Sequence, residues 1–155
     1  MKRLDGKNII ITGGTSGIGK VAAFKLAEHG ANVLISGRNE LNGNMIVDQI
    51  QSLGGKATFF PCNVTVKNDV ELLFNHAKKA MGCIDGLFNN AGIDGQLANF
   101  ADSTEENWDA VLNTNLKGTW YCMKNAISHM LENGKGNIIN MSSTSGLVGN
   151  GFGMT

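Results

Sequence analysis

Hydrophobic positions along the chain alternate between short apolar runs and longer segments with helical periodicity. A short apolar run bounded by turn residues is typical of a buried strand, whereas a periodic segment is typical of a helix that packs one face. The apolar runs predict five strands, over Asn8–Thr12, Ala31–Ser36, Ala57–Cys62, Ile84–Asn89 and Asn137–Ser142. The periodic segments predict helices over Gly17–Gly30, Glu40–Leu53, Lys67–Met81, Thr104–Asn115 and Leu116–Glu132.

This alternation indicates an α/β fold, in which parallel strands are covered by helices on both faces and joined by right-handed crossovers. Pro61 lies inside the third predicted strand, and proline cannot donate to a strand ladder, so that strand belongs at an edge of the sheet. A doubly wound sheet with the order 3-2-1-4-5 has its third strand at an edge. We therefore predict this Rossmann architecture. No linker or repeat divides the chain, so residues 1–155 form one domain.

A glycine-rich turn follows the first predicted strand and opens the first predicted helix. Thr12 to Gly19 read Thr-Gly-Gly-Thr-Ser-Gly-Ile-Gly. Glycine allows a sharp turn and a close approach of ligand to backbone, and the N–H groups and dipole at a helix N-terminus attract phosphate. The turn therefore predicts a site for a phosphate-bearing nucleotide, and its alternative interpretation is a tight turn that binds nothing. A magnesium-dependent NTPase loop is disfavoured because Val21 stands where that loop needs a hydroxyl.

Composition narrows the class of protein. Of the 155 residues, 42% are hydrophobic and 17% are charged, which is typical of a soluble globular protein. Lys+Arg and Asp+Glu both number 13, so no basic excess points to nucleic acid or to a membrane surface. Three scattered cysteines without a paired spacing favour free thiols and a cytoplasmic location. The three histidines are isolated and no metal-ligand cluster appears, so no metal site is predicted.

The ordered motifs of the chain resemble those of the classical short-chain dehydrogenase/reductase family, from the first strand to the last residue. They are Thr12–Gly19, Cys62–Thr65, Asn89–Gly92, Asn113–Gly118 and Asn140–Ser143. The resemblance implies an NAD(P)-dependent oxidoreductase that transfers a hydride between nicotinamide and an alcohol or ketone, and a homo-oligomeric assembly. It implies cofactor contacts from residues in three turns, namely Gly13, Thr15, Ser16, Gly17, Ile18, Gly19, Asn63, Val64, Asn90, Ala91 and Gly92.

Two catalytic residues are also implied by the resemblance. Ser143 matches the family's serine, whose hydroxyl would bond the substrate oxygen, with Ser142 as the neighbouring alternative. Asn115 matches the family's asparagine near the end of a helix, where its side-chain amide would hold a water for proton relay. The alternative interpretation of Asn115 is a residue that ends a helix. Without the resemblance, Ser143 is better read as one hydroxyl in a Ser/Thr-rich loop.

The second predicted strand addresses the choice between the two nicotinamide cofactors. An acidic residue about 20 residues past the glycines binds the ribose 2′-OH and selects NAD. Here the strand ends in Ser36-Gly37-Arg38, with no carboxylate to repel a 2′-phosphate and an arginine that could pair with it. This favours NADP. The alternative interpretation is that Glu40 takes the role of the acidic residue while Arg38 faces solvent, and this leaves NAD open.

The family's mechanism also needs a Tyr-x-x-x-Lys pair, and by the family's spacing the tyrosine would fall one position past Thr155. The tyrosine present, Tyr121, precedes the serine, and Lys124 follows it one residue too early. We therefore expect a family member truncated before its later strands, either naturally or as an artefact, whose 155 residues alone are inactive. The predicted strand over 137–142 would then be an exposed edge and a site of pairing or aggregation. The alternative function is a nucleotide-binding module without turnover.

Overall fold

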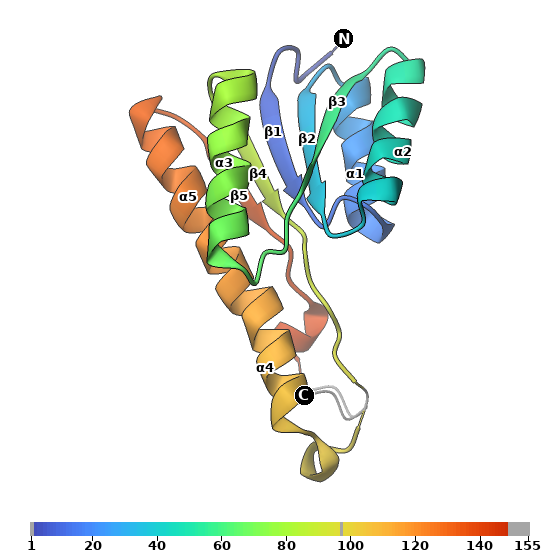
Figure 1. Ribbon diagram of the computed structural model, residues 1–155, viewed down its shortest axis with the longest axis vertical. Coiled ribbons are helices and arrows are strands. Elements are labelled where there is room, and N and C mark those ends of the chain that lie inside the picture. Colours follow the sequence, from blue (N-terminus) through green and yellow to red (C-terminus); the bar gives the residue numbers. More distant parts are fainter. Residues whose placement is uncertain (1, 97, 149–155) are drawn as a thin grey trace.

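Strand pairing places the first strand in the middle of one parallel sheet. The structure is a computed structural model and describes residues 2–96 and 98–148. The sheet order is β3-β2-β1-β4-β5 (Figure 1), which confirms the predicted order and the edge position of the strand that carries Pro61. The strands are β1 (Asn8–Thr12), β2 (Asn32–Gly37), β3 (Lys56–Pro61), β4 (Gly86–Asn89) and β5 (Asn137–Asn140).

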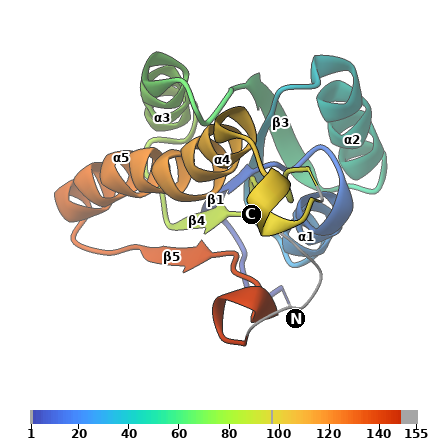
Figure 2. The same ribbon diagram turned by 90° about the horizontal axis from the view of Figure 1, so that it is seen from below.

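Helices cover both faces of the sheet, because successive side chains of β1 and β2 point to opposite sides. Ile10 packs in a core with residues of α3 and α5, whereas the next residue, Ile11, packs in a second core with residues of α1 and α2. Figure 2 shows these two pairs of helices on opposite sides of the strands. The helices are α1 (Gly17–Glu28), α2 (Glu40–Ser52), α3 (Lys67–Met81), α4 (Glu105–Val111) and α5 (Thr119–Glu132).

The helical region before β5 differs from the prediction of two helices that meet at Asn115. A π-helical segment, Leu112–Gly118, joins α4 to α5 without a break, and the residues at both junctions keep right-handed helical backbone. No proline interrupts the run. A Cβ at Gly118 would lie 2.8 Å from Val64 Cγ2, so the widened turn brings the helix backbone close to the loop after β3. Such π-turns are frequent at functional sites.

The last strand is shorter than predicted. β5 ends at Asn140, because the N–H of Met141 makes the final bond to the carbonyl of Asn89, at 2.8 Å, and the chain then turns away. β5 is an edge of the described sheet, and the side chain of Ile139 is 64% exposed. This agrees with the predicted exposed edge, and pairing or aggregation at this edge stays a prediction.

Candidate functional site

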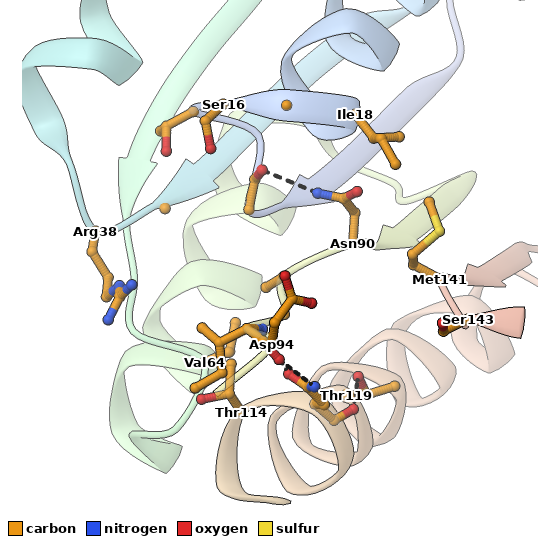
Figure 3. Close-up of a pocket in the computed structure, with 18 of the residues that line it drawn as sticks. Ser16, Ile18, Arg38, Val64, Asn90, Asp94, Thr114, Thr119, Met141 and Ser143 are labelled. Atoms are coloured by element: carbon orange, nitrogen blue, oxygen red, sulfur yellow. Dashed lines mark hydrogen bonds between the residues drawn. The ribbon is translucent and has the colours of Figure 1, made fainter. Parts of the chain in front are cut away.

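A cleft of about 780 Å³ lies where the carboxyl ends of the strands meet. Its walls come from the loops after all five strands and from the π-helical segment. In an open parallel sheet, ligands bind outside the carboxyl ends of the strands, where the strand order reverses. Here the order reverses at β1, whose neighbours are β2 and β4. Figure 3 shows side chains from these separate segments around the same cavity.

The glycine turn forms one wall of this cleft. Gly13 has φ +64°, and a Cβ there would lie 2.7 Å from Ala91 Cα, so the loops after β1 and β4 touch through backbone. Ser16 precedes α1, and its side chain makes no capping hydrogen bond within the described chain. The first turn of α1 carries no acidic residue, so the positive end of its dipole faces the cleft uncompensated. This wall suits an anion such as a phosphate.

Nearly all of the predicted cofactor residues come together in the cleft. Those that line it are Gly13, Thr15, Ser16, Gly17, Ile18, Arg38, Asn63, Val64, Asn90, Ala91 and Gly92. Gly19 does not line it: the residue is buried, and a Cβ there would collide with the carbonyl oxygen of Gly13. The structure thus places Gly19 in the packing of the turn rather than on the surface that faces a ligand.

Hydrogen bonds from the end of β1 hold the turn after β4. Thr12 Oγ1 accepts from the backbone N–H groups of Asn90 and Ala91, at 3.1 and 3.2 Å. The Asn90 side-chain nitrogen donates to the carbonyls of Thr12 and Gly13, at 3.2 and 3.1 Å. The Asn90 nitrogen is therefore used to join the two turns. The sequence analysis did not identify Thr12 as the residue that holds this turn. The signal that could have found it is a hydroxyl at the end of an otherwise apolar strand.

The turn after β3 is ordered by its own side chains. Asn63 Oδ1 accepts from the backbone N–H and the hydroxyl of Thr65, at 3.2 and 3.0 Å, and the N–H of Asn63 donates to Asp69 Oδ2 at 3.1 Å. These bonds fix the loop so that Val64 and Asn63 line the cleft. Cys62 lines it as well, and burial raises the pKa of its thiol to about 11, so it is no nucleophile at neutral pH.

The two predicted catalytic residues lie in the same cleft, with one correction. Asn115 Oδ1 accepts from the N–H of Ile93 at 2.9 Å, and Asn115 Nδ2 donates to the carbonyl of Ile93 at 2.8 Å. Asn115 also lies within the π-helical segment and does not end a helix. Both polar atoms of that amide bond to Ile93, and each keeps one further hydrogen-bonding position, so a water held by Asn115 stays a prediction.

Ser143 stands at the cleft just after β5. It is exposed, and its Oγ accepts from the backbone N–H of Ser145 at 3.2 Å at the start of a short 3₁₀ turn, Thr144–Gly146. This bond orients the hydroxyl and leaves its proton available to donate. Ser142 lines the cleft beside it, so the structure keeps both serines as candidates.

Charge is sparse in the cleft, where Arg38 and Asp94 are the charged lining residues. Arg38 is exposed and has no carboxylate within 4.0 Å in the described part of the chain. Glu40 begins α2 and lines only an adjoining hollow that it shares with Arg38. Arg38 and Ser143 lie toward opposite sides of the cavity, with Asp94 between them (Figure 3).

Tyr121 is not part of the cleft. It packs against the core cluster on the α3 and α5 side of the sheet, and Lys117 Nζ lies 5.8 Å from its ring centroid. Among the residues that the structure describes, no group of three His, Cys, Asp or Glu side chains is placed to hold a metal ion. The described helices include none that is long and apolar enough to cross a bilayer.

Comparison with known proteins decides the family. The family model for short chain dehydrogenase matches residues 7–155. The chain belongs to the short-chain dehydrogenase family. Among curated relatives, it is 36% identical over 149 residues to a 3beta-hydroxysteroid dehydrogenase of Mediterraneibacter gnavus, covering 96% of this chain and 54% of the relative. It is 39% identical over 150 residues to a 2,5-dichloro-2,5-cyclohexadiene-1,4-diol dehydrogenase of Sphingobium indicum, covering 96% of this chain and 59% of the relative.

Solved structures of this family show the same fold. An NAD⁺-bound xylitol dehydrogenase superposes with a TM-score of 0.94 at 28% identity, covering 98% of this chain and 58% of that one. An actinorhodin polyketide ketoreductase with NADPH superposes with a TM-score of 0.91 at 32% identity, covering 99% and 59%. This short-chain dehydrogenase sequence therefore spans between half and three fifths of the length of the relatives that it matches.

Proposed function

We propose that residues 1–155 are the dinucleotide-binding part of an NAD(P)-dependent oxidoreductase that interconverts an alcohol and a ketone. The observation that carries this proposal is the single cleft in which Gly13, Asn90, Asn115 and Ser143 meet. Relatives whose names state dehydrogenases of a hydroxysteroid and of a diol support the alcohol and ketone as substrate class. One structural neighbour holds NAD⁺ and another NADPH, which supports a nicotinamide cofactor.

The residues of the cleft fit such a cofactor. The backbone contact between Gly13 and Ala91 leaves room for no side chain there, and the α1 N-terminus presents N–H groups to a diphosphate. The bound nicotinamide would supply the hydride. Ser143 would donate a hydrogen bond to the substrate oxygen, where negative charge develops when a ketone is reduced. Asn115 would act through the backbone of Ile93, which it holds beside the cleft.

We favour NADP(H) over NAD(H) because of Arg38. Its guanidinium is exposed at the cleft and free of a carboxylate partner in the described chain, so it can pair with a 2′-phosphate. A charge-assisted hydrogen bond contributes about 1.5–3 kcal/mol, which corresponds to roughly 10- to 100-fold in affinity. Glu40 is the argument for NAD(H), since a carboxylate near the ribose 2′ position would favour NAD.

Titration calorimetry with NADPH and NADH tests this assignment. The wild-type chain is expected to bind NADPH more tightly, and Arg38→Ala is expected to remove most of the difference by weakening NADPH alone. Arg3→Ala is the matched control, because Arg3 is exposed and does not line the cleft. Binding of neither nucleotide would overturn the proposed function, and a preference for NADH would overturn the choice of NADP.

We propose that the 155-residue polypeptide binds its cofactor without appreciable turnover. The chain holds one tyrosine, Tyr121, which packs against the core and does not line the cleft, so the described cleft has no phenol to move the substrate proton. This favours a nucleotide-binding module as the second candidate function for this stretch of chain. Ketone-dependent NADPH oxidation by the purified polypeptide, with its mass verified, would contradict the proposal.

We further propose a homo-oligomer in the cytoplasm. The helical run from α4 to α5 exposes large apolar side chains, with Trp108 at 48%, Leu116 at 66% and Trp120 at 53%. Adjacent exposed apolar residues of this size commonly mark a surface that a partner covers. The three cysteines are free, as expected of a protein from a reducing compartment.

A further inference from the structure

The loop after β4 is fastened to the neighbouring helical run by two asparagine side chains. Asn115 binds the N–H and the carbonyl of Ile93. Asn107, in α4, repeats this arrangement further along the loop: its Oδ1 accepts from the N–H of Gln96 at 2.7 Å, and its Nδ2 donates to the carbonyl of Gln96 at 3.4 Å. We call this second pair of bonds the Asn107 clamp. Each asparagine thus replaces a neighbouring strand as the partner of the loop backbone.

The Asn107 clamp is buried and closely packed. Asn107 is 8% exposed, so an amide there without its loop partners would lose hydrogen bonds that water could not fully replace. Between the two clamped residues, Gly95 has φ +75°, and a Cβ there would lie 2.7 Å from Val111 Cγ2 and 2.8 Å from Asn107 Oδ1. The loop therefore runs against α4 with no space for a shift toward it.

The clamped segment lines the nucleotide cleft. Gly92, Ile93 and Asp94 all contribute to its wall, and Asp94 points into the cavity between Asn90 and Thr114 (Figure 3). The start of this segment is held by Thr12, through the N–H groups of Asn90 and Ala91. Its far end has no strand partner, because β4 ends at Asn89. The asparagine side chains take that role.

We propose that Asn107 is a positioning residue for the cofactor cleft, acting through the loop between Asn90 and Gln96. The proposal rests on the proposed function, because what is positioned is the wall that a nicotinamide nucleotide would contact. A loop already fixed in its bound geometry loses less freedom when the ligand binds, and this raises affinity without a direct contact. We expect the gain in affinity to come from the part of the nucleotide that would lie beside Ile93 and Asp94, and not from the 2′-phosphate end near Arg38.

Two nucleotides separate these ends in a binding experiment. NADPH would span the cleft, whereas 2′,5′-ADP carries only the phosphorylated adenosine end. Loss of one or two hydrogen bonds predicts that Asn107→Ala weakens NADPH binding about three- to ten-fold and leaves 2′,5′-ADP binding unchanged. Asn107→Asp keeps an acceptor for the N–H of Gln96 and is expected to retain most of the NADPH affinity. Asn125→Ala is the matched control, since the Asn125 amide donates to the carbonyl of Tyr121 on α5 and does not line the cleft.

Amide hydrogen exchange tests the clamp without any nucleotide. The N–H of Gln96 is expected to be protected in the wild-type chain and to lose protection in Asn107→Ala, while the N–H of Ile93 stays protected through Asn115. An unprotected Gln96 in the wild type, or wild-type NADPH affinity in Asn107→Ala, would overturn the proposal. An equal loss of affinity for NADPH and for 2′,5′-ADP in Asn107→Ala would also overturn the proposal, because it would indicate general destabilisation of the protein. Failure of the wild type to bind either nucleotide would instead overturn the proposed function.

Discussion

The contact between the turns after β1 and β4 leads to a quantitative prediction for Gly13→Ala. The substitution adds one methyl group at a residue with φ +64°, and the new Cβ would lie 2.7 Å from Ala91 Cα and 3.0 Å from Ala91 N. Both neighbours are backbone atoms, so no side-chain rotation relieves the collision. Two separate costs arise, one from the left-handed backbone and one from the overlap.

A control variant that carries only the first cost separates the two. A non-glycine residue in left-handed helical backbone costs roughly 1–2 kcal/mol. Overpacking of a filled interior costs typically about 1–3 kcal/mol. Gly13→Ala is thus expected to lower the free energy of unfolding by about 2–5 kcal/mol, a large share of the roughly 5–15 kcal/mol of a native domain. Gly54→Ala isolates the first cost, because Gly54 has φ +79° and nothing lies within 4 Å of its would-be Cβ.

Urea unfolding of the wild type and both variants, followed by circular dichroism, measures the difference directly. The destabilisation of Gly13→Ala should exceed that of Gly54→Ala by about 1–3 kcal/mol, the overpacking term. Gly19→Ala supplies the converse case, since its φ is not positive and the added Cβ would meet the Gly13 carbonyl. Equal destabilisation by Gly13→Ala and Gly54→Ala would refute the close packing of the two turns.

Two further predictions concern the opposite end of the sheet and the exposed helix face. Burial alone would raise the pKa of Asp85, but hydrogen bonds from the Asn8 N–H and from Lys7 outweigh it and leave that pKa below its ordinary value. The wild type should therefore be more stable than Asp85→Asn at neutral pH. This advantage should disappear as the pH falls from about 4 through the lowered pKa of Asp85. Urea midpoints at several pH values measure the difference in stability, and a difference that stays constant down to pH 2 would contradict the prediction. Leu116→Glu should lower the oligomer mass that light scattering measures. Leu53→Glu is the control and should leave that mass unchanged, because Leu53 follows α2 and is 78% exposed. An unchanged mass in Leu116→Glu would show that the face around Leu116 is not part of the oligomer interface.

The architecture could be read from the sequence because its signals are local. Apolar runs and glycine or proline punctuation are properties of neighbouring residues, and Pro61 agreed with the edge position that the doubly wound order gives its strand and that the structure confirms. The candidate site residues came from the resemblance to the family, and most of them line one cleft because parallel strands bring the ends of distant motifs to one edge of the sheet.

What the sequence did not reveal depends on distant partners. The bonds between the Asn115 amide and Ile93 were not predicted, because no local pattern contains that pairing. Asn107 drew no attention for the same reason, although its bonds to Gln96 are of the same kind. The π-helical segment also escaped prediction; Gly118 at its end lies close to Val64, which belongs to another loop.

The bonds between Thr12 and Asn90 have a consequence for how the protein is made. These residues are 78 positions apart, so the two halves of the cleft come from chain segments that are synthesised at well-separated times. Contacts of such long range form late in folding, because the intervening chain must first be closed into a loop. A nascent chain that ends after β3 has the glycine turn but no opposing wall. The proposed nucleotide site is therefore complete only when β4 pairs with β1, and a nucleotide bound there would stabilise that pairing.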